Sequence, residues 1–273
     1  MSELNVPGAK LYYETYGQGP PVIVVPASSG AVDTYRPMAQ DLAADFTVVI
    51  FDRRGFSRSH LLGAQDYEHR MERDADDVRC LIDHLDAGPA VVFGNSSGAL
   101  VSLAALTRHP EAIATVVAHE APVMTAWPGG QAWIDRFHAL YDMYRRVGPH
   151  PTVSQFQRQT FADSDIATMA AVMNPAKDPY VVGNANYWFE RELRQYPAYV
   201  FDYDTLTEHA RKLVLLNGVE SRGYACYEAT AALGTRVGAR VIEMVGGHTA
   251  HLAVAFELAR AVKDAASVEE PQP

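Results

Sequence analysis

The sequence has only two cysteines, and this shortage excludes several classes of protein. Cys80 and Cys226 are far apart, and neither has the C-x-x-C or histidine spacing of a metal ligand. A disulfide framework or a zinc site needs more cysteines at closer spacing. We therefore expect two buried thiols in a reducing cytoplasm, with no structural disulfide and no metal site.

Basic residues are also scarce, with 23 Lys and Arg against 33 Asp and Glu, which gives a formal net charge of -10. An acidic surface repels phosphate backbones and anionic lipid headgroups. Nucleic acid and membranes are therefore not expected as partners. The charge places no restriction on a neutral small molecule, and the sequence leaves a homodimer open.

Long apolar runs are absent. No stretch approaches the ~18 apolar residues that span a bilayer. Residues 1–14 lack both the basic and the apolar part of a secretory signal. The expected location is the cytoplasm.

Short β-branched runs alternate with helical patterns along most of the chain, at residues 21–26, 46–52, 90–94, 115–120, 212–218 and 240–244. Helical patterns lie between them, most clearly at residues 67–86, 98–108 and 252–265. This alternation predicts an α/β fold with a mostly parallel central sheet flanked by helices. Residues 10–17 are expected to add an antiparallel edge hairpin.

The alternation stops at residues 123–204, which lack a convincing strand and are rich in aromatic residues. Helical pieces are visible at 131–147, 152–161, 165–173 and 184–195. An insertion of this size after the sixth strand predicts a helical cap. The core is then expected to comprise residues 1–122 and 205–273.

Residues 94–98 read Gly-Asn-Ser-Ser-Gly and fit the G-x-S-x-G motif. A buried strand precedes the motif and an apolar helix follows it, which is the setting of a nucleophile elbow. The sequence predicts Ser96 as the nucleophile, with Ser97 the less favoured serine. The amide of Ser97 is the first expected oxyanion donor, and Ser28, after the first buried strand, supplies the second. The alternative is a Gly/Ser-rich turn that needs no central serine.

A serine nucleophile needs a base, and His248 is the histidine in the right place. It follows Gly246 and Gly247 in the loop between the last strand and the last helix, at the same end of the sheet as the elbow. His251, one helical turn further on, is the nearby alternative.

The third member of a triad is a carboxylate that holds the imidazole. Ser221 stands where the aspartate after the fifth run is usually found, with Glu220 one residue out of register. Glu120 ends the run at 115–120, where burial of a carboxylate requires a partner. We favour Glu120 as the acid, and Glu220 is the alternative. Glu120 as a solvated strand-end residue is the third option.

These residues resemble the α/β-hydrolase superfamily along the whole chain, and the loop Asp52-Arg53-Arg54-Gly55 adds its D-x-R-G pattern. The segments GNSSGA, RHPEAI and AHEAP look like those of the zearalenone lactonases. This resemblance implies Glu120 as the acid, Ser28 as an oxyanion donor, and hydrolysis of a bulky hydrophobic lactone, a mycotoxin-degrading activity. No metal or organic cofactor is implied. The cap matches poorly beyond Tyr196 and Pro197.

Tyr187 and Trp188 are candidate substrate-binding residues of the cap, although the same rings could simply pack the cap onto the core. Three other functions remain open for this constellation. Two are enzymatic, a cofactor-free perhydrolase and a carbon–carbon bond hydrolase. The third is a non-catalytic small-molecule receptor on the same fold.

Overall fold

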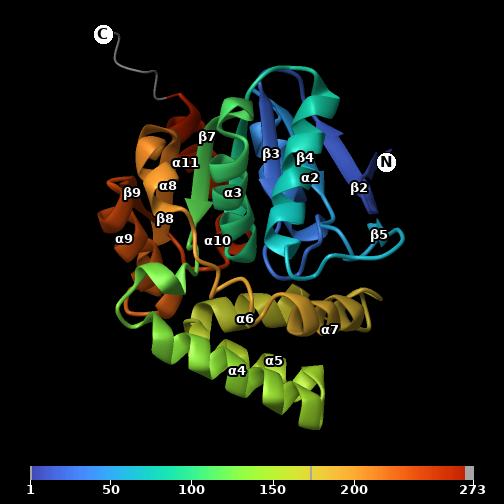
Figure 1. Cartoon of the computed structure of the whole chain (residues 1–273), viewed down its shortest axis with the longest axis vertical. Coiled ribbons are helices and arrows are strands. Elements are labelled where there is room, and N and C mark those ends of the chain that lie inside the picture. The colour runs from blue at the N-terminus through green and yellow to red at the C-terminus, as the bar shows by residue number, and fades with distance from the viewer. Residues whose placement is uncertain (1, 173, 268–273) are drawn as a thin grey trace.

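The computed structural model describes residues 2–172 and 174–267. Its strands are β1 (Ser2–Val6), β2 (Ala9–Tyr16), β3 (Pro21–Val25), β4 (Thr47–Phe51), β5 (His60–Leu61), β6 (Ala90–Asn95), β7 (Ile113–His119), β8 (Leu213–Gly218) and β9 (Arg240–Met244). They form one sheet in the order β1-β2-β4-β3-β6-β7-β8-β9, with β5 paired to β2 (Figure 1).

The sheet is parallel from β4 to β9 and antiparallel at the β1–β2 edge. Along β3, Val22 and Val24 enter one hydrophobic core, whereas Ile23 and Val25 enter the other. Successive side chains of a strand point to opposite faces, so a strand covered on both faces must be apolar throughout. The expected mostly parallel sheet and its edge hairpin are confirmed.

Helices cover both faces of the sheet. One core includes side chains of α2 (Arg70–Leu85), α3 (Ser97–Arg108), α8 (Tyr203–Glu208) and α9 (Ala225–Val237). The other includes side chains of α1 (Arg36–Leu42), α10 (Ala250–Ala253) and α11 (Ala255–Ala266). Single turns of 3₁₀ helix cover Asp33–Tyr35, Pro110–Ala112, Met124–Ala126, Ala210–Lys212 and Val219–Ser221.

Four helices between β7 and β8, here called the cap helices, lie across one end of the sheet (Figure 1). They are α4 (Gly130–Val147), α5 (Pro149–Thr160), α6 (Asp163–Val172) and α7 (Val181–Arg191). The helix expected at 184–195 begins and ends earlier, and residue 173 of the predicted 165–173 lies outside the described residues. The cap helices follow β7, whereas the sequence predicted a cap after the sixth strand. The numbers differ because the two-residue strand β5 was not expected from the sequence. The division into core 1–122 and 205–273 and cap 123–204 stays a prediction.

A buried ion cluster joins the chain after α7 to the core. The Arg53 guanidinium donates to both oxygens of Glu192, at 2.9 and 2.8 Å, and Arg70 Nη2 donates to Glu192 Oε1 at 3.1 Å. Tyr196 donates to Asp74, which also accepts from Arg53 at 3.3 Å. Breaking a buried ion pair is strongly destabilising, so this cluster holds the cap and the D-x-R-G loop in one arrangement.

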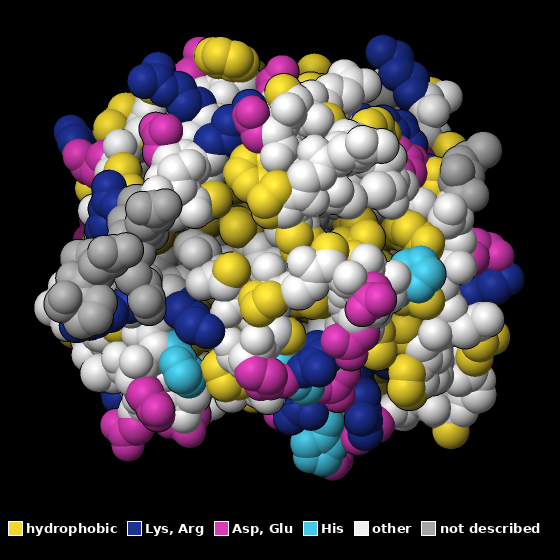
Figure 2. Space-filling model, turned by 90° about the horizontal axis from the view of Figure 1, so that it is seen from above, with side chains coloured by type: hydrophobic (Ala, Val, Ile, Leu, Met, Phe, Trp, Pro, Cys, Tyr) yellow, Lys and Arg dark blue, Asp and Glu magenta, His cyan; other side chains and the backbone are white. Residues whose placement is uncertain are grey.

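On the face opposite the cap helices, acidic and basic side chains are interspersed (Figure 2). No helix within residues 2–172 and 174–267 is long and apolar enough to cross a bilayer. Cys226 is buried as expected, but Cys80 is only half-buried, because it lies at the margin of the apolar stripe of α2.

Candidate active site

Ser96 occupies a strained turn between β6 and α3. Its backbone has φ 55° and ψ -120°, a conformation that non-glycine residues rarely adopt. A Cβ at Gly94 would lie 2.3 Å from the carbonyl oxygen of Gly98, and one at Gly98 would lie 2.1 Å from that of Val25. Both glycines are therefore required by close backbone approach. The turn presents Ser96 at the N-terminus of α3.

Ser96 shares a small cavity of about 30 Å³ with Ser28 and Ser97. Ser97 is the first residue of α3, so its N–H has no partner within the helix. Ser28 lies in the loop after β3, and no hydrogen bond to its N–H is found among the described residues. The structure thus brings together the serine and both residues that the sequence suggested as oxyanion donors.

Glu120 follows β7 and is fully buried, with φ 46°. Its Oε1 accepts the Gly218 N–H at 3.0 Å, and its Oε2 lies 2.7 Å from His248 Nδ1. Burial raises the pKa of this carboxyl, but the hydrogen bond and charge of His248 outweigh burial and bring it below its ordinary value. Glu120 is therefore an ionised carboxylate paired with an imidazole.

His248 is buried beside this carboxylate, and its ring stacks on Phe161 with the centroids 4.4 Å apart. Burial lowers the pKa of the imidazole, whereas the Cys226 sulfur and the Glu120 carboxylate raise it, and the net direction is well upward. Among the described residues, no hydrogen bond joins Ser96 Oγ to His248. Such contacts are often long in ligand-free enzymes and tighten when substrate binds.

The two alternative residues lie elsewhere. Glu220 is exposed, and its carboxylate accepts the Ser164 hydroxyl at 2.8 Å, so the structure does not bring it to His248. The His251 ring stacks on Tyr35 with the centroids 4.4 Å apart. Burial lowers the pKa of His251 to about 3, so it is neutral at physiological pH.

A buried polar network surrounds Asn95, the residue directly before Ser96. The sequence did not predict this network. Asn95 Oδ1 accepts the Tyr35 hydroxyl at 3.2 Å, and Asn95 Nδ2 lies 2.9 Å from His119 Nδ1 and 3.3 Å from the His248 carbonyl oxygen. Burial lowers the pKa of His119 to about 4. These groups tie the strand before Ser96 to the backbone of His248. The only signal in the sequence was the polar Asn95 within an apolar run.

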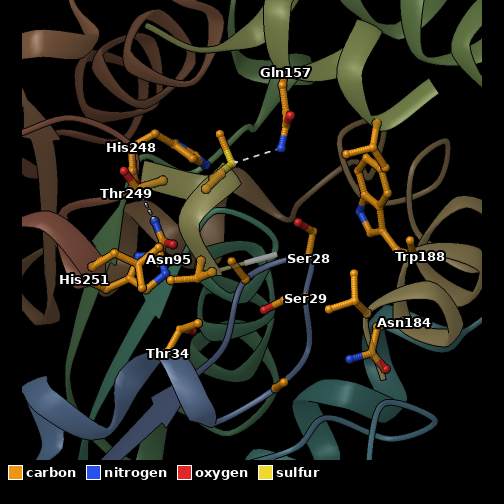
Figure 3. A pocket seen from close by; sticks show the side chains of 18 of the residues that line it. Ser28, Ser29, Thr34, Asn95, Gln157, Asn184, Trp188, His248, Thr249 and His251 are labelled. Atoms are coloured by element: carbon orange, nitrogen blue, oxygen red, sulfur yellow. Dashed lines mark hydrogen bonds between the residues drawn. The ribbon is translucent and has the colours of Figure 1, made fainter. Parts of the chain in front are cut away.

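A larger cavity of about 120 Å³ adjoins the small one, and both are lined by Ser28, Phe156, Phe161 and Trp188. In Figure 3, His248, Thr249 and His251 lie on one side of it, Trp188 and Asn184 on the other, and Ser28 and Ser29 between them. Most of the remaining lining is apolar and includes Ala31, Val153, Met169, Val181 and Leu252. The space beside the serine therefore suits a hydrophobic group.

Tyr187 and Trp188 have different places, although they are adjacent on α7. Trp188 lines both cavities, but Tyr187 lines neither. The Tyr187 ring packs edge-on against Phe56, and it fills the space that a Cβ on Gly55 would need. Its hydroxyl accepts a hydrogen bond from the Arg70 guanidinium. Tyr187 is thus a packing residue, because neighbouring helical residues point about 100° apart.

Among the described residues, no group of three or more His, Cys, Asp or Glu is arranged to hold a metal ion. The buried carboxylates near the cavity are engaged by protein donors instead. Glu120 is held by His248 and Gly218, and Asp165 is held by His248 and Thr249.

Comparison with known proteins shows the family of this chain. The family described as alpha/beta hydrolase fold matches residues 20–156, which is half of the chain. The uncharacterized hydrolase YraK of Bacillus subtilis is 28% identical over 252 residues, which cover 91% of this chain and 89% of that protein.

Two further similarities are to a protein named a hydrolase and to one named a lactonase. A zearalenone hydrolase of Bionectria ochroleuca is 36% identical over 124 residues, which cover 44% of this chain and 47% of that protein. The crystal structure of an enol-lactonase from Burkholderia xenovorans superposes with a TM-score of 0.71 at 20% identity, covering 97% of this chain and 99% of that one. At that identity the second similarity shows the fold alone.

Proposed function

Because this chain belongs to the α/β-hydrolase family, we propose that it hydrolyses carboxylic esters through an acyl-enzyme on Ser96. The observation that carries the proposal is the buried His248–Glu120 pair, 2.7 Å apart, at the end of the sheet where the strained turn presents Ser96. A base oriented by a carboxylate is the standard means of activating a serine.

In the first step, Ser96 Oγ attacks the ester carbonyl carbon while His248 Nε2 takes the hydroxyl proton. The oxyanion is stabilised by the N–H groups of Ser28 and Ser97, each worth about 3 kcal/mol in comparable sites. The carbon–oxygen bond to the alcohol then breaks, and His248 returns its proton to the alkoxide. Glu120 keeps Nδ1 protonated and stabilises the imidazolium throughout.

In the second step, His248 takes a proton from water, whose oxygen attacks the acyl carbon. Collapse of the second oxyanion breaks the bond between the acyl carbon and Ser96 Oγ. The proton held by His248 then returns to Ser96 Oγ. With a lactone as substrate, the carboxylic acid and the alcohol remain on one molecule. All of these steps use protein groups and water.

The lining of the larger cavity supports a bulky hydrophobic ester or lactone as substrate. Its walls are mainly aliphatic and aromatic, with Trp188 and Phe161 between it and the small cavity that contains Ser96. The partial relative named a zearalenone hydrolase favours a lactone among these substrates.

The test is a hydrolysis screen of the purified protein against macrolactones, simple lactones and linear aryl esters, with Ser96→Ala as the matched variant. We expect turnover of at least one ester class by the wild type and none by the variant. Parallel assays with peroxide and with diketones identify a perhydrolase or a carbon–carbon bond hydrolase. Tight ligand binding without turnover contradicts the proposal and favours a receptor.

A further inference from the structure

Asp165 belongs to cap helix α6, yet every hydrogen bond found for its carboxylate comes from the loop that carries His248. Oδ2 accepts the His248 N–H at 3.1 Å. Oδ1 accepts the Thr249 N–H at 2.7 Å and the Thr249 hydroxyl at 2.6 Å. One cap residue thus binds two consecutive amides at the base itself.

The carboxylate is buried, and among the described residues no Arg, Lys or His lies within ion-pair distance of it. A carboxyl group without a cationic partner is costly to bury, so its three hydrogen bonds must offset much of that cost. Asp165 also lies in the first turn of α6, where the helix dipole favours negative charge. These hydrogen bonds can form together only when the loop that carries His248 is in one position.

Gly247 leaves the space that the Asp165 carboxylate occupies beside the loop. A Cβ on this residue would lie 2.7 Å from Asp165 Oδ2, which is closer than real Cβ contacts. Gly247 has no left-handed backbone angle that would otherwise require glycine. Close approach of the cap carboxylate is therefore the physical reason for glycine immediately before His248.

We propose that Asp165 is a positioning residue, through which the cap fixes the backbone at His248 and so aims the imidazole at Ser96 and Glu120. The inference rests on the proposed ester hydrolysis. Asp165 does not touch the reacting atoms. It acts by holding a catalytic group in place, and misplacing such a group by about 1 Å can lower the rate on the order of 100-fold.

The first variant is Asp165→Asn, which keeps the size of the side chain but turns an NH₂ group toward the loop donors. The matched control is Asp163→Asn, which removes the same charge from an exposed residue in the same turn of α6. We expect kcat on an aryl ester to fall about 10–100-fold in Asp165→Asn with KM within about 2-fold, and both constants to be unchanged in the control.

Gly247→Ala tests the contact from the other side and serves if Asp165→Asn does not fold. In the native background the added methyl displaces the carboxylate, so we expect kcat to fall about 10-fold. In an Asp165→Ala background the methyl meets no carboxylate. We therefore expect the double variant to have nearly the same kcat as Asp165→Ala alone. Equal losses in both backgrounds contradict the proposal, because coupled residues are non-additive.

A readout independent of turnover separates this inference from the proposed function. The proton between His248 Nδ1 and Glu120 gives a far-downfield NMR signal, assigned by its loss in Glu120→Gln. We expect the signal to broaden or vanish in Asp165→Asn but to persist in Asp163→Asn. An unchanged signal together with wild-type kcat overturns the role of Asp165 while ester hydrolysis stands. A wild type that cleaves no ester, with the signal lost in Asp165→Asn and kept in Asp163→Asn, overturns the hydrolysis alone.

Discussion

His248 Nδ1 lies 2.7 Å from Glu120 Oε2, although 128 residues separate the two in sequence. Both side chains are buried. The charge and hydrogen bond of His248 lower the pKa of Glu120, whereas the Cys226 sulfur and the Glu120 carboxylate raise that of His248. This pair determines how the site responds to mutation and to pH.

Replacing Glu120 by Gln should lower kcat by about two to four orders of magnitude, because the imidazole loses the acceptor that orients it and stabilises its cation. The matched variant is Glu220→Gln, at the exposed carboxylate that accepts the Ser164 hydroxyl. We expect Glu220→Gln to retain activity within about 2-fold. Steady-state kinetics on one aryl ester measures both. The reverse ranking moves the acid to Glu220.

The pH dependence of kcat/KM should report His248 in the free enzyme. Only the neutral imidazole can act as base, so activity falls as pH decreases through the His248 pKa. Because that pKa is raised, the acid limb should lie above the ordinary histidine value of about 6.5. In Glu120→Gln the residual activity should have its limb at lower pH. An acid limb at or below 6.5 in the wild type contradicts the charge pairing.

Glu192→Gln should lower the free energy of unfolding by about 3–5 kcal/mol, because Arg53 and Arg70 lose a buried partner. Glu190→Gln is the control, two residues earlier and within α7. Glu190 pairs with the exposed Arg145 at 3.3 Å, and such surface pairs contribute about 1 kcal/mol or less. Urea unfolding compares the two variants. Equal losses would show that the buried cluster does not stabilise the attachment of the cap.

Acid should destabilise the fold in part through His251. Its pKa is about 3 in the folded protein and about 6.5 in the unfolded chain, so between these values only the unfolded chain binds the proton. Stability is therefore lost as pH falls from 6.5 toward 3, by up to about 1.4 kcal/mol per pH unit. His251→Phe keeps a ring stacked on Tyr35 but has no group that titrates. Between pH 7 and 4.5 its free energy of unfolding should therefore fall less than that of the wild type.

The control for that measurement is His138→Gln, at an exposed histidine of α4. Its unfolding free energy should follow the wild-type pH dependence. If His251→Phe also follows the wild-type curve, the neutral buried state of His251 is wrong.

Much of the fold is readable in the sequence because its signals are local. The run at residues 21–25 predicts a strand covered on both faces, and the glycines at 94 and 98 predict the tight turn around Ser96. Helix α1 escaped prediction because its seven residues are too few to show a clear helical period. The order of the strands in the sheet requires tertiary contacts that no single segment encodes.

The parts of the site that escaped prediction depend on side chains meeting distant backbone. Asp165 binds two amides that lie 83 and 84 residues away, and an amide has no residue signature in the sequence. The rotation of α7 about its axis likewise decides that Trp188 rather than Tyr187 reaches the cavity. Cap packing sets that rotation, and it is not visible in the aromatic pattern itself.

The central claim is that Ser96 carries the acyl group during turnover, and rapid acid quench followed by peptide mass spectrometry tests it most directly. With an aryl ester in excess, the peptide containing Ser96 should gain the mass of the acyl group, and the Ser96→Ala protein should gain none. An acyl group found on another residue, or turnover that persists in Ser96→Ala, would contradict the account.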